Sequence, residues 1–181
     1  MKPEMAEASE TKQNVMRSLR LAKVAVNISV GKSGEPLEKA VKVLEKITEQ
    51  KPCPRKAMKT IKEFGIRKGE PIACMTTLRG EKADKFLKTA LTTIGNKLPK
   101  THFDEAGNFA FGIKEHIEIP GAKYDPALGI FGMNVAVSLE RPGFRVNRRV
   151  PQKSKVGRSH LISREEAVQF IKEKFGTEIV E

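Results

Sequence analysis

The stretch LAKVAVNISV, at positions 21–30, alternates apolar side chains with polar or small ones. A period of two places every second side chain of an extended chain on the same face. One face carries Val24, Val26, Ile28 and Val30, and the other carries Lys23, Ala25, Asn27 and Ser29. We therefore expect a half-buried strand whose open face is lined by short or polar side chains.

Three further segments, 71–80, 109–113 and 133–139, show the same alternation and are predicted to be strands. The last of them is followed by RPGF at 141–144, which places proline and glycine at the two central positions of a type II turn. The strand before this turn is therefore expected to form a hairpin with a strand after it.

Three segments have the spacing or the end residues of a helix. Apolar residues recur at helical intervals over 37–47 and, most clearly, over 86–98, where Pro99 is expected to end the helix. A capping box at 163–166 begins a third helix, which is predicted to end at Gly176. Strands and helices do not alternate strictly. This pattern predicts an α+β fold of two layers, a mainly antiparallel sheet with helices packed on one face.

The 181 residues suffice for one domain with a sizeable core. We expect residues 1–13 to be a flexible lead-in, because they are acidic and polar, and 14–181 to form a single domain with a basic extended segment at 145–160. No stretch resembles a signal peptide or approaches the roughly 18 apolar residues of a membrane span. The two cysteines, Cys53 and Cys74, favour reduced thiols in a cytoplasmic protein that has no membrane partner.

Positive charge gathers in two segments of this chain, whose formal net charge is +12. Between 141 and 158 lie seven basic residues and no acidic one, and between 51 and 68 lie seven basic residues and the single acid Glu63. A solubilising surface is the ordinary interpretation of a charge run. Here a phosphate backbone is the better partner, since each lysine or arginine that neutralises a phosphate releases a condensed counterion. In the second half of the chain the candidate phosphate ligands are Arg145, Arg148, Arg149, Lys153, Lys155 and Arg158.

Patterns for catalysis, metals and cofactors are weak. VGKS at 30–33 lies between a strand and a helix, but a phosphate-binding loop needs a glycine where this chain has Val26. The three histidines and two cysteines lack the spacing of a zinc site. Asp104 and Glu105 lie near His102, yet adjacent acids in a glycine-containing turn are more often turn formers than a catalytic pair. We expect no enzyme activity, no catalytic residue, no metal and no cofactor.

The open face of the predicted sheet favours RNA. It collects the short or polar residues Asn27, Ser29, Thr77, Arg79, Asn134 and Ser138. Such side chains let a backbone-and-sugar surface come close and offer it donors and acceptors, which suits a shallow minor groove lined with 2′-hydroxyls. A merely solvated sheet face is the alternative, and it would contain more threonine, lysine and glutamate. Because most phenylalanines fall on core positions, base stacking over the sheet is disfavoured.

Five segments then occur in a recognisable order: VNISVG (26–31), ITEQKP (47–52), RKGEPI (67–72), TLRG (77–80) and FDEAGN (103–108), the last followed by YD (124–125). This series resembles the large-subunit ribosomal protein L-five family, which binds 5S ribosomal RNA, over about residues 14–176. The segment VNRRVPQKSKVGRSH (146–160) is similar to the archaeal and eukaryotic branch of that family.

The resemblance implies that the sheet face binds 5S rRNA in the central protuberance of the large subunit. It implies RNA contacts at Asn27, Gln50 and Thr77, and phosphate contacts at Lys51, Arg55, Lys56 and Arg79. Residues 64–70 match a loop that reaches the peptidyl-site (P-site) tRNA, namely Phe64, Gly65, Ile66, Arg67, Lys68 and Gly69, followed by Glu70. Residues 103–132 would face the small-subunit head, and large-subunit rRNA and other ribosomal proteins are further implied partners. Ser29 departs from the family, where glycine is common.

Two other functions stay open at the level of sequence. The same face could serve a free RNA-binding regulator or chaperone, and His102 or His116 could act as the base of an RNA-processing enzyme. Co-sedimentation with the large subunit at high salt separates the first from a ribosomal protein. RNA turnover that is lost in His102→Ala would identify the second.

Overall fold

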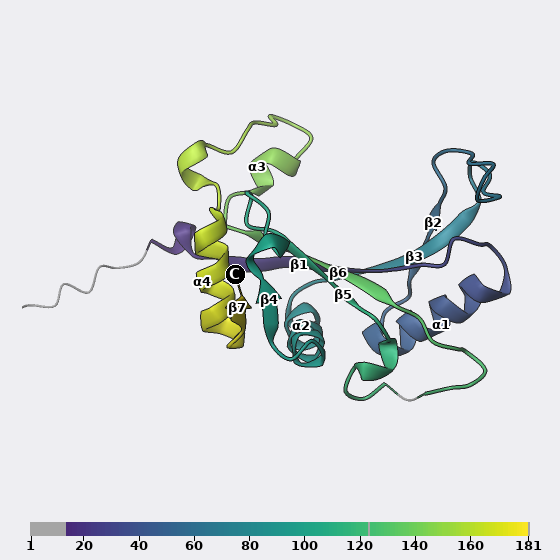
Figure 1. The fold of residues 1–181 in the computed structure, drawn as a ribbon. Coiled ribbons are helices and arrows are strands. Elements are labelled where there is room, and N and C mark those ends of the chain that lie inside the picture. The colour runs from purple at the N-terminus through teal and green to yellow at the C-terminus, as the bar shows by residue number, and fades with distance from the viewer. Residues whose placement is uncertain (1–13, 123, 181) are drawn as a thin grey trace, which may run out of the picture.

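A five-stranded antiparallel sheet forms the centre of the molecule in the computed structural model, which describes residues 14–122 and 124–180 (Figure 1). The strand order is β2-β3-β1-β6-β5. The strands are β1 Arg20–Ser29, β2 Cys53–Lys56, β3 Pro71–Leu78, β5 Phe109–Ile113 and β6 Met133–Glu140. The predicted α+β class is confirmed, whereas the predicted lead-in, 1–13, lies outside the described residues.

The alternation at 21–30 is realised in β1, the middle strand of the sheet. Val24, Val26 and Ile28 are at most 1% exposed, and they lie in the core with every second residue of β3 and β6. The intervening side chains of β1 point to the other face, which no helix of the described residues covers (Figure 1). Because the period of a strand is two, this one segment fixes which face of the sheet is buried.

Helices α1 (Glu35–Thr48) and α2 (Glu81–Thr93) pack against one face of the sheet (Figure 1). Each contributes a fully buried stripe at helical spacing, which includes Leu44 in α1 and Leu87 in α2. Burying a leucine of this kind stabilises the fold by about 1.5–3 kcal/mol. The two-layer arrangement predicted from the sequence is therefore correct.

The second predicted helix ends earlier than its spacing suggested. It stops at Thr93, because Gly95 and Asn96 adopt the left-handed conformation, with φ of 69° and 55°. Leu98 is fully buried, but it belongs to strand β4 (Lys97–Pro99), which pairs in parallel with β7 (Glu178–Val180). The helical interval that placed Leu98 in the helix was a coincidence of spacing.

The C-terminal helix α4 (Arg164–Phe175) begins and ends as predicted. The Ser163 hydroxyl accepts a hydrogen bond from the Glu166 backbone N–H at 3.3 Å, and the Glu166 carboxylate accepts one from the Ser163 N–H at 3.1 Å. Gly176 closes the helix in the left-handed conformation. Four 3-10 turns complete the described chain: η1 Val15–Arg17, η2 Lys100–His102, η3 His116–Glu118 and η4 Arg158–His160.

The hairpin predicted after residue 140 is wrong, although its turn is present. The Phe144 N–H donates to the Arg141 carbonyl at 3.4 Å, and Gly143 has a φ of 98°. The chain then enters a short helix, α3 (Arg145–Arg148), instead of a strand. The reason is topological: β6 already pairs with β1 on one side and β5 on the other, so no free edge remains beside it.

Two segments rise from the open face of the sheet, opposite α1 and α2 (Figure 1). At one end stands the β2–β3 arm, which we define as residues 53–70. At the other end stands the α3 arm, residues 145–160. The sheet forms the floor between them, so the molecule has the shape of a saddle. Among the described residues, no helix has the length and apolar character to cross a membrane.

Candidate RNA-binding surface

The floor of the saddle is built from small side chains in rows that cross the strands. One row runs Ala110, Ala136, Ala25 and Thr77, and the next runs Gly112, Asn134, Asn27 and Met75. Ser29 beside Ala73 and Ser138 beside Lys23 extend the face at its two ends. None of these floor residues is aromatic, and alanine or glycine occupies the centre. A rigid, close-packed ligand surface can therefore approach the sheet backbone closely.

Polar groups of the floor are held in fixed orientations. The Asn27 side-chain amide donates to the Ser29 hydroxyl at 2.9 Å, and the Ser138 hydroxyl donates to the side-chain Oδ1 of Asn108 at 2.9 Å. Ser29, the predicted departure from the family, thus orients Asn27. Each pair keeps further donor and acceptor capacity for a ligand.

The β2–β3 arm is an ordered hairpin. The N–H groups of Ile61 and Ile66 donate to each other's carbonyl oxygens at 2.9 and 3.1 Å, and the Gly65 N–H donates to the Lys62 carbonyl at 3.0 Å. A tight turn therefore forms the tip, where Phe64 is 70% exposed. The sequence placed two glycines around this tip, and both have positive φ, as their turns require.

Glu70 joins the base of this arm to the loop between β1 and α1. Its carboxylate accepts hydrogen bonds from the Ser33 hydroxyl and from the Arg67 N–H, the latter at 3.0 Å. These bonds, that of Ser33 first, hold the pKa of Glu70 below its ordinary value. The carboxylate therefore stays charged at neutral pH and holds the base of the arm in place, in a segment whose other acid is Glu63.

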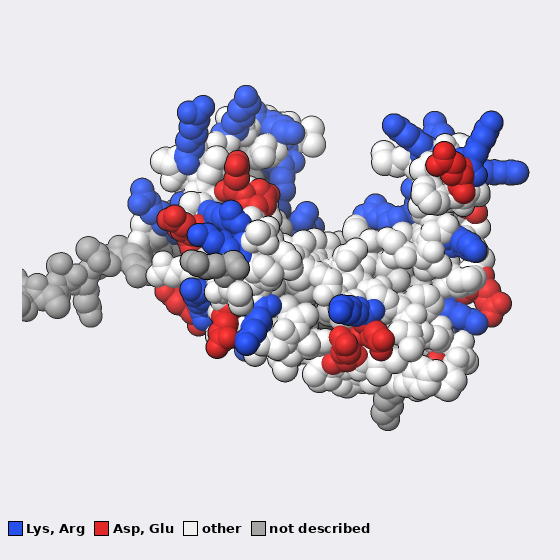
Figure 2. Space-filling model, viewed as in Figure 1, with Lys and Arg blue, Asp and Glu red and all other residues white. Residues whose placement is uncertain are grey.

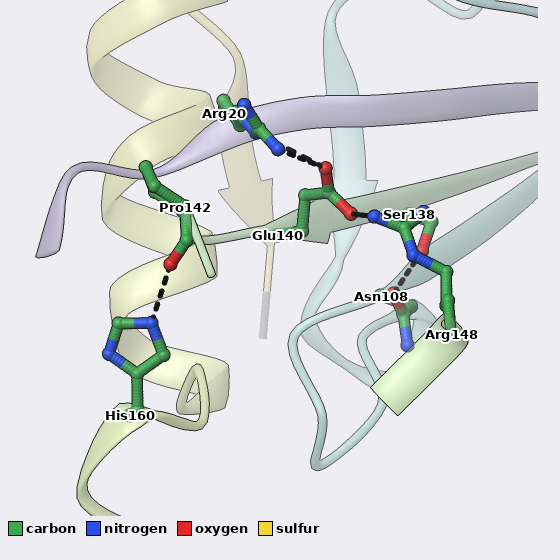
Figure 3. Close-up of polar contacts among 7 residues, drawn as sticks. All are labelled: Arg20, Asn108, Ser138, Glu140, Pro142, Arg148 and His160. Atoms are coloured by element: carbon green, nitrogen blue, oxygen red, sulfur yellow. Dashed lines mark hydrogen bonds and ion pairs between the residues drawn. The ribbon is translucent and has the colours of Figure 1, made fainter. Parts of the chain in front are cut away.

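The α3 arm is attached to the sheet through Glu140 at the end of β6 (Figure 3). The Glu140 carboxylate, whose side chain is 11% exposed, accepts from Arg20 of β1 and from Arg148 of α3, each at 2.7 Å. At the far end of the arm a His160 ring nitrogen lies 2.8 Å from the Pro142 carbonyl oxygen. Arg148, a predicted phosphate ligand, thus donates one edge of its guanidinium to Glu140, and its side chain stays largely exposed.

Basic side chains cluster on both arms (Figure 2). Of the floor residues named above, Lys23 is the charged one. On the α3 arm, Arg145, Arg149, Lys153, Lys155 and Arg158 are exposed, and this arm contains no acidic residue. Arg141, which begins the basic run in the sequence, is buried and pairs with Glu166 at 2.7 Å. The saddle thus presents two positively charged walls to any ligand that enters it.

The structure brings most of the predicted contact residues into the saddle. Asn27, Ser29 and Thr77 lie on the floor. Arg55 in β2 pairs with Ala73, and its guanidinium lies 3.8 Å from the Met75 sulfur at the edge of the floor. Four further predicted contacts are exposed: Gln50 and Lys51 on the connection from α1 to β2, Lys56 at the end of β2, and Arg79 directly after β3.

Sequence reasoning missed Ala110, Gly112 and Ala136 as site residues. They were expected in strands, but a small side chain carries no charge or hydrogen-bonding group that attracts attention. Their shared face follows only from the pairing of β5 with β6 and of β6 with β1. The signal was present in the alternation of 133–139, whose polar positions are unusually small.

Of the histidines and cysteines considered above for catalysis or metal binding, His116 and Cys74 are buried and His102 is exposed. His116 is 4% exposed, its Nδ1 accepts from the Phe131 N–H at 3.2 Å, and desolvation lowers its pKa. His102 is exposed in η2. Cys74 is fully buried in β3, and burial raises the pKa of its thiol to about 11, which keeps it protonated.

Comparison with known proteins accounts for nearly all of the described residues. Residues 14–67 match the family model "Ribosomal protein L5", and residues 71–170 match the model for the C-terminus of the same ribosomal family. "Large ribosomal subunit protein uL5" of Sulfurisphaera tokodaii is 52% identical over 169 residues, which covers 93% of this chain and 96% of that protein. The proteins of the same name from Pyrobaculum aerophilum and Archaeoglobus fulgidus are 49% identical (98% of this chain, 99% of theirs) and 53% identical (88% and 89%). The chain therefore belongs to the ribosomal protein L5 family, whose members are structural and not enzymes.

Proposed function

We propose that this structural protein of the large ribosomal subunit binds 5S rRNA in the central protuberance, with the RNA seated across the saddle. The observation that carries the proposal is the combination of a floor of small, polar side chains with a basic arm at each end. The floor permits close approach, and the arms supply the charge. The resemblance to the family singles out 5S rRNA among possible ribosomal RNAs.

The physical match is to an RNA helix with an irregular or looped part. A-form RNA presents a wide, shallow minor groove with 2′-hydroxyls, which can contact the amide and hydroxyl groups of Asn27, Thr77 and Asn134. Its phosphates then run along both arms, where lysine and arginine release counterions. The ends of the saddle thus contribute affinity, and the floor contributes selectivity for shape.

We further assign separate partners to separate parts of the chain. The tip of the β2–β3 arm, residues 64–69, contacts P-site tRNA, since it projects away from the floor and exposes Phe64 beside Arg67 and Lys68. Residues 103–132 face the small-subunit head. The exposed side chains of the α3 arm follow large-subunit rRNA phosphates, and we predict that the arm reaches its final conformation on that RNA.

Hydroxyl-radical footprinting of transcribed 5S rRNA tests the proposal. With the purified chain we expect one continuous protected stretch on a single helical arm of the RNA, at nanomolar to micromolar protein. Protection that is scattered, or equal for an unrelated hairpin of the same length, would show that the saddle does not recognise 5S rRNA.

Asn27→Ala is predicted to lower affinity for 5S rRNA by about 1–3 kcal/mol, because a buried RNA group loses its partner. The melting temperature should not change, since Asn27 lies on the open face. Filter binding and thermal unfolding measure the two quantities. Gln169→Ala on α4 is the control, an exposed carboxamide on another surface that should bind normally. Normal binding by Asn27→Ala would remove this face from the interface.

Arg67→Ala is predicted to leave 5S affinity within about twofold of wild type, because the arm tip serves another partner. Arg55→Ala removes the same side chain from the base of the same arm, at the floor, and should weaken binding about fivefold or more. Both variants are measured on one 5S transcript. If Arg67→Ala costs as much as Asn27→Ala, the separation of tip and floor is wrong.

A further inference from the structure

We infer that the hollow at the foot of the α3 arm holds an unstacked nucleobase of the bound 5S rRNA. This inference rests on the proposed function and names one contact of that interface. The hollow lies where the floor meets the arm, because its lining joins Lys23 and Ser138 of the floor to Asn147 and Arg148 of α3. An RNA that crosses the floor therefore reaches it directly.

The hollow has a volume of about 480 Å³ and opens to solvent. Its walls come from β1, the turn at 104–108, the end of β6 and α3. Leu161 and Ile162 form part of its apolar surface. Ligand pockets in proteins begin at about 300 Å³, so the hollow has room for one base and part of its ribose.

Groups suited to a base converge on this hollow. The hydrogen-bonded pair Ser138 and Asn108 lines it with Asn147, which together offer donors and acceptors to a base edge. Phe144 and the guanidinium of Arg148 offer planar groups, and Glu140 holds that guanidinium in place at 2.7 Å. Aromatic and guanidinium planes with amide groups are the usual means by which proteins bind splayed-out RNA bases.

The composition of the hollow favours a base over a phosphate. Two carboxylates line it: that of Glu140 is paired with Arg20 and Arg148, whereas that of Glu105 is exposed and would repel an anion. Lys23 at the rim suits the phosphate that flanks the base. The floor itself has no aromatic side chain on which a base could stack, so the edge of the floor is where a base can be recognised individually.

The chain offers a matched pair of alanines for the test. Ala106 lines the hollow, and Ala127 lies in the loop before β6. Both are exposed, and each backbone N–H donates to the aspartate two residues earlier, Asp104 at 3.2 Å and Asp125 at 3.1 Å. Leucine at either position must fit the same kind of hydrogen-bonded turn, but only Ala106→Leu fills the hollow.

We expect Ala106→Leu to bind 5S rRNA about tenfold or more weakly, the loss of one stacked base, with an unchanged slope of log affinity against log salt. Ala127→Leu should bind as wild type. Equal binding by Ala106→Leu and wild type overturns the proposal. A wild-type chain that fails to protect 5S rRNA is a different result, because it removes the proposed function itself.

A second measurement addresses the hollow without the large RNA. Titration of the full chain with AMP, GMP, CMP and UMP is followed by amide NMR shifts, with inorganic phosphate as the control. We expect shifts at Ser138 and Asn147 that differ between bases and disappear in Ala106→Leu. Shifts that inorganic phosphate reproduces would show an anion site and overturn the assignment to a base.

Discussion

Replacing Ala136 by glutamate should weaken binding of 5S rRNA by about a hundredfold or more, which corresponds to about 2.7 kcal/mol. Ala136 lies at the centre of the floor, between Ala110 on β5 and Ala25 on β1. A glutamate there holds the RNA away from the sheet backbone. It also places a negative charge opposite the RNA, where desolvation makes an unpaired carboxylate costly.

The fold should accept this change, because the Ala136 side chain is exposed on the open face. Ala127→Glu makes the same change in net charge on a loop outside the saddle and is the matched control. Filter binding at constant salt compares the two, and circular dichroism checks that both are folded. If both variants lose the same affinity, the effect is one of overall charge, and the floor is not the contact surface.

The sheet could be predicted largely from local pattern. The alternation at 21–30, 71–80 and 133–139 reports burial on one face, and burial of one face is what fixes a strand in place. The capping box at 163–166 was equally local, since its two hydrogen bonds join residues three apart. Such features need no knowledge of the rest of the fold.

Elements that depend on distant partners could not be predicted in this way. Leu98 appeared to continue a helix, but its strand exists because β7, near the far end of the chain, pairs with it. The strand expected after Gly143 failed because both edges of β6 were already paired. In both cases tertiary contacts overrode a correct observation about spacing or turn chemistry.

In the candidate site, too, some features follow from local sequence pattern and others depend on residues outside that pattern. Asn27, Ser29 and Thr77 were predicted to share a face, and they do. The pairing of Arg148 was missed, because the run from 141 to 158 contains no acid. The acid is Glu140, the residue immediately before that run. A charge count over a window cannot show which arginines already pair with an acid, and only the structure shows these pairs.

Replacing Arg149, Lys153 and Lys155 together by alanine should weaken association with ribosomal RNA by roughly a hundredfold or more at about 0.1 M salt, if all three neutralise phosphates. The three side chains are exposed on the α3 arm. Their contribution is electrostatic, so the slope of log affinity against log salt should become shallower by about two to three units. The core should remain folded, since none of the three belongs to it.

Two control variants are measured in the same salt titration. Lys42, Lys88 and Lys172 are exposed on α1, α2 and α4, and their replacement removes the same charge from outside the saddle. Their loss should change the slope by less than about one unit, because only a charge close to phosphate displaces condensed counterions. Arg148→Ala should also change the slope by less than about one unit, since its guanidinium pairs with Glu140. Equal slopes for wild type and the Arg149, Lys153 and Lys155 variant, over the same salt range, would mean that the α3 arm does not bind along the phosphate backbone.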